Sequence, residues 1–136
     1  MISLAFLTAA AIATASPALA CRCVTVSPGE KVAQSAAIFI GTADRTVNSD
    51  EEGSDGGYTV FKAMEMLKGT AADELYVSHP FDLGGNCGVD FEVGKEFLVV
   101  ATANVADELS TDLCTMSGAS EAEIRAVLKA GTKTAP

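Results

Sequence analysis

Basic side chains and histidine are scarce in this chain of 136 residues. It has 9 Lys and Arg residues against 18 Asp and Glu residues, which gives a net charge of −9, and it has a single histidine. Nucleic acids and anionic lipid surfaces attract basic proteins. The charge therefore argues against both as partners.

Recognisable catalytic and metal-binding motifs are also lacking. No Ser, Asp or Cys near His79 completes a known nucleophile motif, and the cysteines do not have the C-x-x-C spacing of structural zinc sites. We therefore predict that the protein is not an enzyme and has no catalytic residue, intrinsic metal or cofactor. His79 precedes Pro80 in an expected loop, and we interpret it as a surface histidine.

The first twenty residues contain no charged side chain. An apolar run from Leu4 to Ala15 leads to Pro17 and to the small residues Ala18 and Ala20. This pattern is typical of a secretory signal peptide with an A-x-A cleavage site, and the run is short for a membrane span. We predict a signal peptide over 1–20, cleavage before Cys21 and a secreted or periplasmic product. Residues 21–136 then form a single domain with a flexible tail from about 132.

All four cysteines, Cys21, Cys23, Cys87 and Cys114, follow the predicted cleavage site. An even number in an exported chain predicts two disulfides. Three pairings are possible, and a bridge between Cys21 and Cys23 is disfavoured because they are so close in sequence. Two alternatives remain open: lipidation of Cys21, and a redox-active C-x-C pair.

The rest of the pattern predicts a short helix, five strands and a second helix. Ser27, Pro28 and Glu30 form a capping box that begins the first helix, and Ser120 and Glu123 form another that begins the last. The expected strands are Ala36–Ala43, Tyr58–Gly69, a short one around Leu75 and Val77, Phe97–Ala101, and Leu109–Leu113 ending at Cys114. The segment Tyr58–Gly69 is ambiguous, because Val60, Phe61, Met64 and Leu67 would also fit one face of a helix, and we interpret it as a strand. This order predicts a mainly β fold, a five-stranded Greek-key barrel of the OB type with helices at its ends.

Turns and helix ends complete this prediction. We expect Gly131 to cap the last helix at its C-terminus. The acidic segment 48–57 misses the spacing of an EF-hand, so we interpret it as a solvated loop. A glycine-rich loop carries Cys87.

Six segments together resemble the netrin-like domain family, specifically the amino-terminal domain of the tissue inhibitors of metalloproteinases. They are C-R-C at Cys21–Cys23, AIFIGTA at Ala37–Ala43, LKG at Leu67–Gly69, NCG at Asn86–Gly88, F-x-x-G-x-x-F-L-V at Phe91–Val99 and LSTDLC at Leu109–Cys114. The resemblance covers most of residues 21–136. Its specificity lies in the order and spacing of the segments.

This resemblance implies an OB-type barrel with the disulfides Cys21–Cys87 and Cys23–Cys114. It also implies that the α-amino nitrogen and carbonyl oxygen of Cys21 chelate the catalytic zinc of a target protease. The inhibitory ridge would consist of Arg22, Cys23, Asn86, Cys87 and Gly88. Where the inhibitors usually have a small second residue, this chain has Arg22.

We therefore expect a protein partner, specifically a zinc metalloprotease. Two other functions fit the same residues: a non-inhibitory structural or adhesion module whose disulfides only stabilise it, and an exported C-x-C thiol oxidoreductase. The oligomeric state stays open, and the acidic composition is compatible with a monomer.

Overall fold

The computed structural model describes residues 21–134, so the predicted signal peptide lies outside the described residues. The helices are α1 (Pro28–Gln34), α2 (Leu113–Met116) and α3 (Glu121–Thr134). The strands are β1 (Ala37–Asn48), β2 (Gly56–Lys68), β3 (Glu74–Pro80), β4 (Glu96–Ala103) and β5 (Leu109–Ser110). Within the described residues, no helix has both the length and the apolar character needed to cross a membrane.

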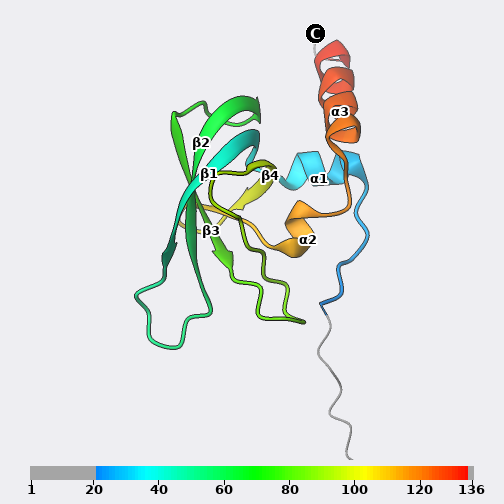
Figure 1. Cartoon of the computed structure of the whole chain (residues 1–136). Helices are drawn as coiled ribbons and strands as arrows, with labels where there is room; N and C mark the ends of the chain where they lie inside the picture. Colours follow the sequence, from blue (N-terminus) through cyan, green and yellow to red (C-terminus); the bar gives the residue numbers. More distant parts are fainter. Residues whose placement is uncertain (1–20, 135–136) are drawn as a thin grey trace, which may run out of the picture.

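The five strands form a closed barrel in the order β1-β2-β3-β5-β4 (Figure 1). Neighbouring strands are antiparallel except for β3 and β5, which are parallel. This arrangement is the Greek-key barrel of the OB type. The predicted fold class is confirmed.

Aromatic rings fill the inside of the barrel. Phe61 on β2 makes edge-on contacts with Phe39 on β1 and with Phe91, at ring-centroid distances of 5.5 and 4.9 Å. Edge-to-face pairs of this kind add to the stabilisation from apolar burial. Phe39 and Phe61 are fully buried, so this cluster anchors the barrel.

A second apolar cluster joins the helices to the outside of the barrel. Ile38 of β1 and Val100 of β4 pack with Val32 of α1 and Ile124 of α3. Ile38 and Phe39 are consecutive, so their side chains enter opposite faces of β1. The first part of β1 is therefore buried on both faces, which explains its apolar sequence at Ala37–Ile40.

The end of α1 is held by a lysine from the sheet. The capping box at Ser27 and Glu30 is present, as predicted. At the other end, Lys68 Nζ of β2 donates hydrogen bonds to the carbonyl oxygens of Val32 and Ser35, the latter at 2.6 Å. Val32 O also accepts from the Ser35 hydroxyl (2.7 Å), so carbonyl groups that the helix end leaves without backbone partners are satisfied by side chains.

Three boundary predictions were wrong. The expected strand over Leu109–Leu113 stops at Ser110, because Asp112 accepts a hydrogen bond from Thr115 N (2.7 Å) and begins α2. β1 extends beyond Ala43 to Asn48, so the acidic loop covers only 49–55. Gly131 does not end α3, which continues to Thr134, because its backbone does not adopt a left-handed conformation. Part of the predicted tail is therefore helical.

Candidate functional site

Two disulfides attach the N-terminal segment to the barrel. Cys21 is bonded to Cys87 and Cys23 to Cys114, with Cα–Cα distances of 5.1 and 5.2 Å. This is the pairing that the resemblance implies. We call the surface formed by residues 21–24, 86–88 and 114 the cysteine ridge.

The two disulfides lie against each other. Cys114 Sγ is 3.7 Å from Cys21 Sγ and 3.9 Å from Cys87 Sγ. The sulfurs of Cys21, Cys23 and Cys114 are close enough for a metal site, but each belongs to a disulfide and the described residues include no free cysteine. Metal binding and thiol exchange both require a thiolate, so in this oxidised state the sulfur atoms serve as cross-links.

Residues next to the two disulfides in the N-terminal segment are exposed. Arg22, Cys23 and Val24 all lie on the surface, and the Val24 side chain is 85% exposed. Cys21 is partly buried. A short, covalently anchored segment thus presents exposed residues, one of them apolar, to solvent.

Arg22 borders a recess on the surface of its own domain. It lines a pocket of about 340 Å³ together with Lys31, Asp112 and Cys114. Residues of the N-terminal segment, α1, β4 and α2 contribute to the wall of this pocket.

The loop that carries Cys87 is closed by Asn86. Its side-chain oxygen accepts a hydrogen bond from Leu83 N (3.0 Å), and its side-chain nitrogen donates one to Phe81 O (2.7 Å). The Asn86 amide is thus engaged within its own loop, so its predicted place on the ridge is mainly structural. Loops whose polar groups are satisfied in this way keep a defined shape.

Gly88 allows this loop to fold back on itself. A Cβ atom at Gly88 would collide with the carbonyl group of Phe81, and the residue is buried. Only glycine permits such close backbone approach. The N-C-G sequence therefore combines an amide that closes the loop, a disulfide anchor and a tight backbone contact.

A buried lysine supports the other side of the ridge. Lys31 Nζ of α1 donates hydrogen bonds to the carbonyl oxygens of Cys114 and Thr115, each at 3.0 Å. Burial lowers the pKa of Lys31, and the nearby Asp112 partly opposes this. Leu113 N also donates to Cys87 O (2.9 Å), so α2 is tied to both α1 and the Cys87 loop. Nothing in the sequence pattern points to this role of Lys31, because its partners are backbone atoms distant in the chain.

His79 is not a surface residue, and this prediction was wrong. It lies on β3 and is only 3% exposed, with ring-centroid distances of 5.5 Å to Phe81 and 5.0 Å to Phe91. Its Nδ1 lies 3.2 Å from Pro80 O, a group that can only accept, so Nε2 accepts from Thr59 Oγ1 at 2.7 Å. Burial lowers the pKa of His79 and favours its neutral form.

Comparisons with protein-family models and with curated proteins found no match for this chain. The resemblance to netrin-like domains therefore stays a prediction. The geometry itself offers an exposed N-terminal segment that two disulfides attach to the barrel.

Proposed function

We propose that this chain is an exported netrin-like protein that binds and inhibits a zinc metalloprotease through Cys21. The observation that carries the proposal is the double attachment of an exposed N-terminal segment. Cys21 and Cys23 flank a single residue, and each is bonded to a different part of the domain. The segment thus has few conformations to lose when it binds a partner.

Cleavage before Cys21 gives the chemistry that the proposal requires. It frees an α-amino group one residue beyond the predicted signal peptide. This nitrogen and the Cys21 carbonyl oxygen can together displace the water from the open position of a catalytic zinc. The amine binds in its neutral form, and its reference pKa of about 7.7 to 8.0 means that a proton is released from most of the population at neutral pH.

Arg22 restricts the targets that this mechanism would accept. Its side chain is exposed and directly follows Cys21. A charged side chain is costly to bury in an apolar pocket unless it is paired. The proposed target therefore has a carboxylate where Arg22 enters its substrate-binding cleft.

The first test compares two forms of the protein that differ by one residue. One form begins at Cys21 with a free amine, verified by intact mass, and the other carries an additional Ala before Cys21. Both are assayed against a panel of zinc metalloprotease catalytic domains. We expect the free-amine form to inhibit at least one protease, and the extended form to be weaker by about 100-fold or more, because its N-terminal nitrogen becomes a peptide amide.

A form with the additional Ala at the C-terminus serves as the matched control. All three forms keep both disulfides, so their melting temperatures should agree. Equal inhibition by the free-amine and extended forms would contradict chelation by Cys21. Absence of inhibition across the panel would overturn the inhibitor function and leave a disulfide-stabilised binding module.

A further inference from the structure

A groove of about 590 Å³ lies on the barrel surface beside β2, β3 and β5. Tyr58, Tyr76 and Leu109 form its apolar part, and Glu74, Asp107 and Glu108 add carboxylates. It shares no residue with the cysteine ridge. An inference about this groove is therefore independent of the proposed protease inhibition.

Two exposed tyrosines face the groove. Tyr58 is 36% exposed and Tyr76 is 52% exposed, and their ring centroids are 5.9 Å apart. The outward residues of β3 alternate with buried ones, which places Glu74, Tyr76 and Ser78 on the same outer face. Paired tyrosines outside the core offer rigid apolar contact area to a partner.

The barrel is weakly closed along this groove. β3 pairs with β2 over its whole length, from Glu74 to Pro80, but with β5 only at Val77 and Ser78. Over Glu74–Tyr76, the described residues give β3 no partner strand on its β5 side. An extended peptide can add to such an open strand edge through main-chain hydrogen bonds.

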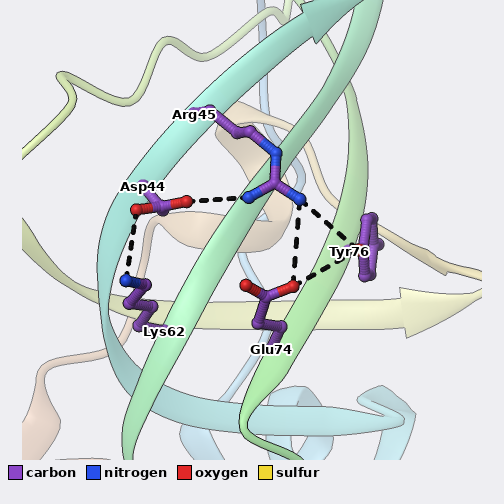
Figure 2. Close-up of polar contacts among 5 residues, drawn as sticks. All are labelled: Asp44, Arg45, Lys62, Glu74 and Tyr76. Atoms are coloured by element: carbon purple, nitrogen blue, oxygen red, sulfur yellow. Dashed lines mark hydrogen bonds and ion pairs between the residues drawn. The ribbon is translucent and has the colours of Figure 1, made fainter.

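The charges on one side of the groove balance one another. The Arg45 guanidinium lies 2.8 Å from the Asp44 carboxylate and 3.8 Å from that of Glu74, and Lys62 pairs with the other oxygen of Asp44 at 3.6 Å (Figure 2). The hydroxyl of Tyr76 also donates to Glu74 (3.3 Å). Two cations thus match two carboxylates, and Glu74 contributes little net charge to the groove.

The carboxylates on the other side have no such match. Asp107 and Glu108 form no ion pair among the described side chains. Asn104 orients Glu108, because its side-chain nitrogen donates to the Glu108 carboxylate (3.1 Å) and its side-chain oxygen accepts from Glu108 N (3.0 Å). The groove therefore combines tyrosine rings with an uncompensated charge of two carboxylates.

We infer that this groove binds an extended peptide segment of a partner protein that carries lysine or arginine. The cationic side chain lies between the tyrosine rings and the carboxylates of Asp107 and Glu108, where cation–π attraction and charge complementarity act together. The peptide backbone runs along the open edge of β3 at Glu74–Tyr76. The negative charge of the groove selects a basic peptide over an acidic one.

The test measures binding of fluorescein-labelled (Lys-Val)₃ by fluorescence anisotropy, with (Glu-Val)₃ as the acidic counterpart. The protein used is the mature chain from Cys21 with both disulfides intact. We expect saturable binding of the basic peptide only. The double variant Asp107→Asn/Glu108→Gln and the single variant Tyr76→Leu should each weaken binding by about tenfold or more.

The double variant Glu51→Gln/Glu52→Gln is the matched control. It removes the same number of carboxylates from the exposed acidic loop, which does not line the groove. We expect it to change binding by less than about twofold, because attraction to distant surface charges is screened by salt. If both double variants weakened binding equally, the net charge of the protein alone would explain the effect, and the inference would be overturned. Failure of the basic peptide to bind would overturn it as well, and far-UV circular dichroism checks that every variant is folded.

Discussion

The cysteine ridge and the barrel core are held in place by different forces. In the core, Phe39 and Phe61 are fully buried and contact each other edge-on. On the ridge, Arg22 and Val24 are exposed, and the disulfides of Cys21 and Cys23 fix this segment to the barrel. An exposed surface is not stabilised by burial, so covalent bonds and backbone hydrogen bonds replace packing there.

Removal of the Cys23–Cys114 disulfide should have the largest effect on stability. This bridge joins residues 91 positions apart, and in the chain-entropy model it constrains the unfolded state by roughly 4 to 5 kcal/mol. The variant Cys23→Ser/Cys114→Ser should lose about that much free energy of unfolding in a urea titration. The far-UV circular dichroism of the barrel should persist at low temperature.

The second bridge provides the comparison. The variant Cys21→Ser/Cys87→Ser opens a shorter loop of 66 positions and should be destabilised slightly less. A loss below about 1 kcal/mol in both variants would mean that packing, and not the disulfides, holds the ridge.

Truncation of Phe61 should be nearly as damaging, but through the core. Phe61→Ala removes the ring that contacts Phe39, Phe91 and Phe97 and leaves a cavity inside the barrel. The expected loss is about 4 kcal/mol. It is measured by the same urea titration, with both disulfides intact.

An exposed residue on the same strand is the control for this variant. Met64→Ala on β2 should change stability by less than about 0.5 kcal/mol, because Met64 is mostly exposed. Comparable losses for Phe61→Ala and Met64→Ala would contradict the burial pattern of β2.

The barrel could be predicted from the sequence because its signals are local. The capping boxes at Ser27 and Ser120 and the apolar strands are visible in short windows of sequence, and they give the element order. The strand at Tyr58–Gly69 was also compatible with a helix, and the structure shows it as β2. Strand order and disulfide pairing depend on distant residues, so the element order and the family resemblance had to supply them.

The burial of His79 and the helix α2 were not predicted, although the sequence contains a signal for each of them. Leu75, Val77 and His79 alternate along β3, so extending the period of two by one step would have placed His79 inside. Asp112 is a residue type that is favoured at a helix N-cap, and the strand interpretation ignored this signal. The contacts of Lys31 with Cys114 and Thr115 could not have been found, because backbone acceptors leave no trace in side-chain patterns.

Lys31 tests how far the ridge depends on α1. Lys31→Met keeps the apolar stem but removes the two hydrogen bonds to Cys114 O and Thr115 O. We expect a loss of about 2 kcal/mol in the free energy of unfolding, since hydrogen bonds from a charged group are worth more than neutral ones. Faster hydrogen exchange confined to α2 and the Cys87 loop would locate the effect.

A lysine on the barrel surface is the matched control. Lys95→Met removes an exposed ion pair with Glu92 and should cost at most about 0.5 kcal/mol. If Lys31→Met were equally mild, the disulfides alone would be enough to hold α2 against the ridge.

His79, in the core, should give the smallest effect on the free energy of unfolding, and this effect should depend on pH. Burial lowers the pKa of His79 in the folded protein, so the unfolded chain takes up the proton first as the pH falls. Stability contributed by neutral His79 is complete above the reference pKa of about 6.5 and is lost below it, by at most about 1.4 kcal/mol per pH unit. Because His79 is the only histidine, the wild-type protein should lose stability between about pH 6.5 and 5, before most carboxylates titrate. His79→Gln should flatten the curve over that range in urea titrations at each pH, and an unchanged slope in this variant would show that other groups cause the dependence.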